Sequence, residues 1–378
     1  MPDERRAILV IDDEPEQVRG ILLELADEAE VLHPEELDAA HLQATSLLLV
    51  DHQIDDINWQ RRSSYPLSCQ PQDGLALAAI LQSHLRSDRL AHPSPVAVAL
   101  LSGKLNELTG LDNPRENIAA RACGLDWAFS KSQSPAFEHE LPIRIRSFAY
   151  AVRALPQSWP TAPLESQEKL AEFLGLQDAE WSGIALIHVD RCRPPVHEPA
   201  FWTHGTALLR WLAQQILPYR TFLLDELQLA VRFGVTPRWL GGKLTSGGPL
   251  STALSEALYK GNLRELMGPR WWIAGIDALL WTVTAGGSGG ANEVRDWLKG
   301  HVGEEPEPLG NNETLIIKED LCFDGTTARY TDCVRVWPDD WPPFAEVPWT
   351  TVELAKSTSR LGALVMASDI DRLATDET

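Results

Sequence analysis

Short apolar runs separated by polar stretches recur through the first 155 residues. The clearest runs are Ala7–Ile11, Ser46–Val50 and Val96–Leu101, each made of Val, Ile, Leu and Ala residues apart from Ser46, and each followed by a polar residue. Shorter runs at Val31–Leu32 and Trp127–Phe129 have the same character. Continuous apolar runs of this length are typical of strands buried on both faces of a parallel sheet. The pattern therefore predicts five buried strands.

Between these runs, apolar residues recur every three or four positions, which is the spacing of a helix with one buried face. We expect helices at Glu16–Ala29, Asp73–Leu85, Glu116–Ala122 and Phe137–Leu155. Strands that alternate with helices form parallel sheets with helices on both faces. The first part of the chain is therefore predicted to be an α/β domain with a doubly wound, parallel, five-stranded sheet.

Polar side chains of a particular kind follow four of the predicted strands. Asp12 and Asp13 come after the first strand, Asp51 after the third, Ser102 after the fourth and Lys131 after the fifth. In an open α/β sheet, ligands bind beyond the carboxyl ends of the strands. If the strands are parallel, three carboxylates, one hydroxyl and one ammonium group share this edge. Two adjacent carboxylates repel each other, and such a pair is usually held by a divalent cation.

This arrangement resembles the receiver domain of two-component response regulators, which has a flavodoxin-like fold. The resemblance covers roughly residues 1–155 and depends on the acid pair, the lone Asp, the Ser-Gly and the Lys occurring in that order at successive strand ends. Asp73-Gly74 also matches a common element of that family. Each of these motifs is weak alone, but their agreement in order is specific.

The resemblance implies that Asp51 accepts a phosphoryl group from a histidine kinase or a phosphotransfer protein. It also implies that Asp12, Asp13 and Asp51 bind Mg²⁺, a hard ion that bridges carboxylates and phosphate. Lys131 and Ser102 would contact phosphate oxygens. Such a transfer needs positioning and charge neutralisation more than covalent help, and these side chains are suited to both tasks.

The sequence departs from the receiver pattern in three places. An insertion spans residues 55–72, next to the predicted site, and Ser132 follows Lys131 where the family usually has a proline. In addition, Trp127 and Phe129 stand on either side of the position where the family has an aromatic residue in the fifth strand. A degenerate receiver that acts as a constitutive interaction module therefore stays open as an alternative.

From residue 156 the character of the chain changes. Pro156–Pro163 is rich in proline and is the predicted linker, and 12 of the 14 tryptophans lie from Trp159 onward. We expect residues 164–378 to form a mainly helical, Trp-rich output domain. The predicted helices are Glu165–Leu174, His204–Leu217, Phe222–Phe233, Leu250–Leu258, Trp271–Thr284 and Thr350–Leu361, and a small β-hairpin is predicted from Thr314–Lys318 and Cys333–Trp337.

One stretch of this second half suggests a DNA-binding output. A helix that ends at Gly234, followed by a second helix with Thr236 at its N-cap, is similar to a helix-turn-helix. Arg232, Arg238 and Lys243 are the candidate DNA-binding residues. A helical pair with a glycine turn is also common in proteins that never bind DNA. We therefore expect an output that binds a protein partner, with DNA binding as the alternative.

The composition of the chain narrows the classes of function and the cellular locations that remain open. The formal net charge of -21 argues against broad binding to nucleic acids or anionic membranes. Five scattered cysteines without a CxxC motif and a charged N-terminus favour a cytoplasmic location. Trp271–Ala285 is the best membrane candidate, but it is too short to span a bilayer and contains Asp277. No nucleophile–base or metal set stands out in the second half, so no enzymatic output is predicted.

Overall fold

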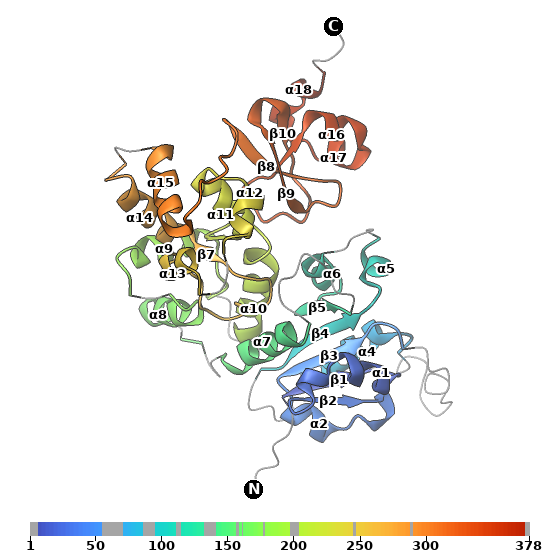
Figure 1. Cartoon of the computed structure of the whole chain (residues 1–378). Helices are drawn as coiled ribbons and strands as arrows, with labels where there is room; N and C mark the ends of the chain where they lie inside the picture. Colours follow the sequence, from blue (N-terminus) through green and yellow to red (C-terminus); the bar gives the residue numbers. More distant parts are fainter. Residues whose placement is uncertain are drawn as a thin grey trace. The chain divides into compact units, whose positions relative to one another are not determined.

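The computed structural model of the chain describes residues 7–54, 71–85, 95–110, 115–131, 141–155, 159–160, 162–176, 178–196, 204–244, 247–287 and 290–374. The chain forms two compact units, each made of several segments (Figure 1). The first unit contains Met1–Gly175, Pro194–Pro218 and Gly261–Gly268. The second contains Leu176–Arg193, Tyr219–Lys260 and Pro269–Thr378.

The first unit is built on a parallel sheet of five strands. These are β1 (Ile8–Ile11), β2 (Ala29–Leu32), β3 (Leu47–Asp51), β4 (Ala97–Ser102) and β5 (Trp127–Ser130). Their order is β2-β1-β3-β4-β5, and every neighbouring pair is parallel. This is the strand order of flavodoxin-like doubly wound sheets. The predicted α/β class and parallel five-stranded sheet are confirmed.

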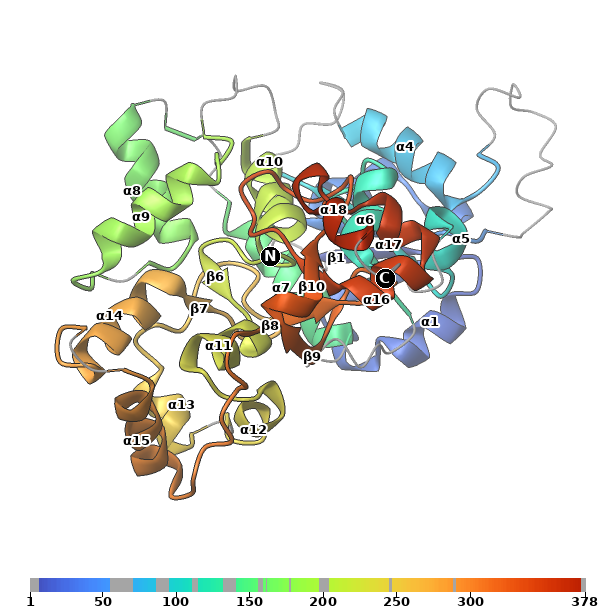
Figure 2. The same ribbon diagram turned by 90° about the horizontal axis from the view of Figure 1, so that it is seen from above.

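Helices cover both faces of this sheet, which explains why β1 is apolar throughout and why β3 and β4 are apolar up to their last residues. On one face, Leu9, Leu48 and Val98 pack with apolar side chains of α2 (Ala39–Ala44), α4 (Gly74–Leu85) and α6 (Glu116–Ala122). On the other face, Phe148 of α7 (Leu141–Arg153) contacts the rings of Trp127 and Phe129. Helix α1 (Pro15–Ile21) lies on the side opposite α4 (Figure 2).

The predicted helix Glu16–Ala29 is too long. Helix α1 ends at Ile21, a 3₁₀ turn η1 (Leu23–Leu25) follows, and Ala29 already belongs to β2. The reason is strand pairing, because Ile8 of β1 pairs with Ala29 and extends β2 to four residues. Three further short helices were not predicted: η2 (Pro34–Glu36), α2, and α5 (Leu105–Thr109).

The first unit is larger than residues 1–155. It also contains α8 (Pro163–Phe173), α10 (His204–Trp211) and the π-helical turn η4 (Leu212–Ile216). Gln214 of η4 is buried, and its amide donates to the backbone oxygens of Leu125 and Asp126 at 2.8 and 2.9 Å. Arg210 of α10 forms an ion pair with the buried carboxylate of Asp126. Residues from the predicted output domain thus complete the first unit.

The second unit begins with a helical part packed around aromatic side chains. Trp272 is fully buried and contacts the rings of Phe222, Tyr259 and Trp181. The elements of this part are α9 (Ser182–Arg191), β6 (Leu223–Leu224), α11 (Glu226–Phe233), α12 (Pro237–Gly241), α13 (Pro249–Ala253), β7 (Trp271–Trp272), α14 (Ile273–Val283) and α15 (Ala291–Val302). The predicted helices Phe222–Phe233 and Trp271–Thr284 therefore each begin with a two-residue strand, since β6 and β7 pair with one another.

The C-terminal part of the second unit contains a mixed sheet in place of the predicted hairpin. Its strands β8 (Glu313–Ile317), β9 (Phe323–Arg329), β10 (Cys333–Arg335) and β11 (Trp349–Thr351) have the order β10-β11-β8-β9. The hairpin partner of β8 is β9, which was not predicted, and β11 lies between β8 and β10. The prediction missed β9 because its sequence, FDGTTAR, has few apolar residues.

Short helical elements complete this C-terminal part: η5 (Tyr330–Asp332), α16 (Val352–Ser357), α17 (Ser359–Ala363), η6 (Ala367–Asp369) and α18 (Asp371–Ala374). Across the described residues of both units, every helix is too short or too polar to cross a lipid bilayer.

Candidate functional site

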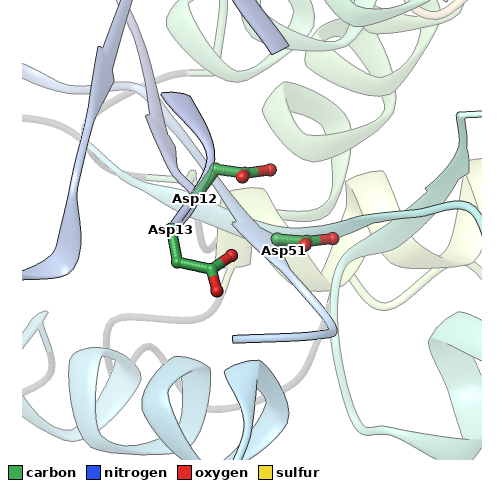
Figure 3. A group of neighbouring side chains, drawn as sticks. All are labelled: Asp12, Asp13 and Asp51. Atoms are coloured by element: carbon green, nitrogen blue, oxygen red, sulfur yellow. The ribbon is translucent and has the colours of Figure 1, made fainter. Parts of the chain in front are cut away.

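The three predicted carboxylates meet at the carboxyl edge of the parallel sheet. Asp12 and Asp13 follow β1, and Asp51 is the last residue of β3, the strand beside β1 (Figure 3). The order of the strands reverses at this pair, which is where doubly wound sheets bind ligands. One oxygen from each carboxylate lies within 4.8 Å of the others. The structure therefore confirms that these side chains are grouped.

Lys131, directly after β5, joins the three carboxylates. Its ammonium nitrogen lies 3.0 Å from Asp12 Oδ2 and 3.0 Å from Asp51 Oδ1. The backbone N–H of Lys131 donates to the carbonyl of Ser102 at 2.8 Å, because β4 and β5 are paired at this end. The structure thus places Ser102, which is 1% exposed, at the strand end next to Lys131.

Burial shapes the electrostatics of the cluster. Asp12 is 1% exposed and Asp51 8% exposed. Burial, together with the nearby charge of Asp12, raises the pKa of Asp51 to about 6, although Lys131 opposes this shift. Burial acts to lower the pKa of Lys131, but the carboxylates of Asp51 and Asp12 outweigh it and raise that pKa above its usual value. Near neutral pH the cluster therefore holds an ionised lysine between carboxylates.

The start of α4 is fitted closely against Asp51. Gly74 donates its N–H to the carbonyl of His52 at 3.0 Å, and Asp73 Oδ1 accepts the N–H of Ala76 at 2.7 Å. A Cβ atom at position 74 would lie 1.5 Å from the backbone oxygen of Asp51. Only glycine allows this approach. The Asp73-Gly74 pair thus caps the helix and leaves room for the backbone of Asp51.

The donor set fits a hard divalent cation. All three side chains offer carboxylate oxygens, the ligands that such ions prefer. Two oxygens bound to one Mg²⁺ at about 2.1 Å are separated by about 3.0 Å when adjacent and about 4.2 Å when opposite. The oxygens of Asp12, Asp13 and Asp51 all lie within 4.8 Å of one another and would draw together around an ion of this size. The cluster can therefore hold a metal ion.

The candidate DNA-binding residues lie on the predicted pair of helices. Helix α11 ends at Phe233 and is followed by Gly234, whose φ of 68° is the left-handed conformation of a helix C-cap, and Thr236 Oγ1 accepts the N–H of Trp239 at the start of α12. Two of the three bases are paired with acids within the second unit: Arg232 with Asp277 and Lys243 with Glu304. Arg238 is exposed, and Trp239 is buried.

Some of the predicted features lie outside the described residues. These are residues 55–70 of the insertion and Ser132. Conversely, no pattern in the sequence predicted the buried ion pair near the site, between Glu116 of α6 and Arg144 of α7. These residues are 28 positions apart and follow no motif. One signal could have indicated the pair, because a charged residue on the apolar side of a predicted helix, such as Arg144, needs a buried partner.

The fold and the site together define a class: an α/β unit with a parallel flavodoxin-like sheet and a cluster of carboxylates suited to a metal ion at its carboxyl edge. Comparison of the chain with protein-family models, curated proteins and solved structures gives no match.

Proposed function

We propose that the chain is the response regulator of a two-component phosphorelay, phosphorylated on Asp51. The observation that carries this proposal is the grouping of Asp12, Asp13, Asp51 and Lys131, in which one ammonium contacts two carboxylates at 3.0 Å. An acceptor carboxylate, a set of oxygen donors for Mg²⁺ and a fixed positive charge are the parts that phosphoryl transfer to an aspartate requires.

In this proposal each side chain of the cluster has a defined task. An oxygen of Asp51 attacks the phosphorus of a phosphohistidine on a kinase or phosphotransfer protein, the P–N bond breaks, and the imidazole leaves. Asp12, Asp13 and Asp51 hold Mg²⁺, which supplies positive charge to the phosphoryl oxygens when bound. Lys131 moves from Asp51 to a phosphoryl oxygen, and the Ser102 hydroxyl donates to another. The product is an acyl phosphate on Asp51.

The proposed output is binding of a protein partner by the second unit. Two observations support it over DNA binding. Arg232 and Lys243 are each neutralised by an acid, and Trp239 is buried where base reading would need an exposed polar side chain. In addition, Ile184, Ile187 and Trp281 of this unit are more than half exposed, as is common for residues that contact other proteins.

The test is phosphorylation of the full chain. We expect that Mg²⁺ and a small phosphodonor add one phosphoryl group, seen by mass spectrometry, and that Asp51→Asn abolishes the addition. Glu16→Gln is the matched control, because it removes one exposed carboxylate from α1 without touching the cluster. Failure of the wild-type chain to react with millimolar donor would favour the degenerate receiver, in which the first unit acts as a constitutive interaction module.

A further inference from the structure

Behind the carboxylate cluster lies a buried ion pair within the first unit. Glu116 of α6 and Arg144 of α7 are each 3% exposed. Arg144 Nη1 donates to Glu116 Oε1 at 3.1 Å, and Nη2 donates to Oε2. Removing two charges from water is costly, and a buried pair of this kind is often less stabilising than apolar packing. The other hydrogen bonds of Glu116 and Arg144 therefore bear on the role of the pair.

The carboxylate of Glu116 is tied to the site through β5. Glu116 Oε1 accepts the backbone N–H of Ser130 at 2.8 Å, and Oε2 accepts the indole N–H of Trp127 at 3.0 Å. Ser130 directly precedes Lys131, whose ammonium contacts Asp12 and Asp51. A movement of the backbone at Lys131 therefore acts directly on the hydrogen bond between Ser130 and Glu116.

Arg144 ties the same pair to a distant part of the chain. Its Nε donates to the carbonyl of Leu266 at 2.8 Å. Leu266 lies in Gly261–Gly268, a segment that belongs to the first unit although the chain on both sides of it, Tyr219–Lys260 and Pro269–Thr378, belongs to the second. We call this segment the insert. The chain on both sides of the insert thus continues directly into the proposed output.

The insert is held in a conformation that its own sequence disfavours. Leu263 is 2% exposed and has a φ of 62°, in the left-handed region that residues with a side chain rarely adopt. Such strain persists only while surrounding contacts impose it. Besides the bond from Arg144, the backbone N–H and side-chain amide of Asn262 both donate to the carbonyl of Phe173. Loss of these contacts would free the insert to relax to another conformation.

We propose that the hydrogen bonds from Ser130 through Glu116 and Arg144 to Leu266 form a relay that releases the insert when Asp51 is phosphorylated. This inference rests on the proposed function. The added phosphoryl charge draws Lys131 away from its present position between Asp12 and Asp51, and the N–H of Ser130 moves with it. Glu116 Oε1 then loses the N–H that it accepts from Ser130, the guanidinium of Arg144 shifts with the carboxylate, and the carbonyl of Leu266 is no longer held. The strained segment supplies the second state that a switch requires.

Hydrogen exchange of two backbone amides tests the relay in the full chain. The N–H of Asn262 is bonded to Phe173 and that of Leu266 to Leu263, both at 3.0 Å, so their exchange reports release of the insert. With Mg²⁺ and beryllofluoride, a mimic of the phosphoryl group, we expect both amides to exchange at least about fivefold faster, the low end of typical coupling between sites. Fluorine NMR of bound beryllofluoride measures occupancy independently.

Two variants of the ion pair separate a relay from a merely structural contact. In Arg144→Lys one ammonium cannot reach both Glu116 and Leu266, and in Glu116→Gln the Ser130 contact is weakened. In either variant we expect fast exchange at Asn262 and Leu266 without beryllofluoride and no further increase with it. Arg146→Gln is the matched control, since it breaks the α7 ion pair with Glu28 and leaves the relay intact. This control should respond like the wild type.

The outcomes are distinguishable. If no bound beryllofluoride is detected, the proposed function fails and the relay fails with it. If beryllofluoride binds and the amides of the insert keep their exchange rates, the relay alone is overturned. An equal response of wild type, Arg144→Lys and Glu116→Gln also overturns it, because the insert would then move without the ion pair.

Discussion

At the scale of single residues, Asp51 is placed by its backbone as much as by its side chain. The carboxylate is buried beside Asp12 and Lys131, while its carbonyl faces the start of α4 at Gly74. An acceptor must be held within a fraction of an ångström of its partners, because misplacement by about 1 Å can cost on the order of a hundredfold in rate. The glycine is therefore part of the site although it carries no side chain.

This close contact predicts the effect of Gly74→Ala. The new methyl group would lie 1.5 Å from the Asp51 oxygen, so α4 or the end of β3 must shift. We expect the free energy of unfolding to fall by about 3 kcal/mol, as for an overpacked core position, and phosphorylation of Asp51 to be lost. Urea unfolding and mass spectrometry measure the two effects.

Gly103→Ala is the control, because a methyl group there meets no atom within 4 Å although it lies next to Ser102. We expect this variant to stay within about 0.5 kcal/mol of the wild type and to react normally. If both variants behave alike, the close approach at Gly74 is not what positions Asp51.

At the scale of elements, Arg335 of β10 and Asp369 of η6 form an ion pair that joins the two elements, and we call this pair the clamp. The guanidinium of Arg335 donates to both carboxylate oxygens of Asp369, and the backbone N–H of Arg335 donates to Oδ2 at 2.9 Å. The guanidinium also lies 5.7 Å from the centre of the Trp349 ring. Residues 34 positions apart are thereby joined, which closes the C-terminal sheet against the helices that follow it.

The clamp predicts a dependence of stability on pH. The hydrogen bonds from Arg335 lower the pKa of Asp369 to about 2, below its value of about 3.9 in an unfolded chain. A depressed carboxylate pKa contributes stability above the unfolded value, and this contribution is lost as pH falls from about 4 towards 2. Since the Arg335 side chain is 38% exposed and screened by solvent, we expect Asp369→Asn to cost about 1 kcal/mol at pH 7.

Urea unfolding of the full chain at several pH values measures this dependence. The difference between wild type and Asp369→Asn should shrink between pH 4 and 2. Glu319→Gln, an exposed carboxylate on the β8–β9 turn, should show no such trend. A constant difference across the pH range would mean that the charge of Asp369 does not contribute.

At the scale of the whole molecule, the two units do not follow the order of the sequence. Residues 194–218 and 261–268 belong to the unit that contains the parallel sheet. They supply partners for buried polar groups of that unit: Arg210 for Asp126, Gln214 for the carbonyl of Leu125, and the Leu266 carbonyl for Arg144. A buried polar group without its partner costs about 1–3 kcal/mol.

We therefore predict that residues 1–155 alone form a less stable sheet than the full chain. With these partners missing, we expect the slowest amides of β3 and β4 to lose at least about 2 kcal/mol of protection in hydrogen exchange. A fragment of residues 1–218 restores Arg210 and Gln214 but not Leu266, and should recover part of the loss. Equal protection in all three proteins would show that the first 155 residues are self-sufficient.

The local pattern of apolar and polar residues determined much of the parallel sheet and of the candidate site. Apolar runs identified the five strands of the sheet to within about two residues, and the rule that parallel strands share a carboxyl edge grouped Asp12, Asp13, Asp51 and Lys131 correctly. Both inferences depend on residues close together in the chain or on repetition of one local unit. Helix ends were less accurate where pairing took residues into a strand, as at Ala29.

Only the tertiary structure decided which distant residues meet. The pairing of β8 with β9, the clamp of Arg335 on Asp369, and the bonds from Glu116 through Arg144 to Leu266 leave no periodic trace in the sequence. The physical reason is that a buried charge needs a partner within hydrogen-bonding distance but does not prescribe where in the chain that partner stands. Packing of the whole chain makes that choice, and with it the assignment of the insert to the sheet unit.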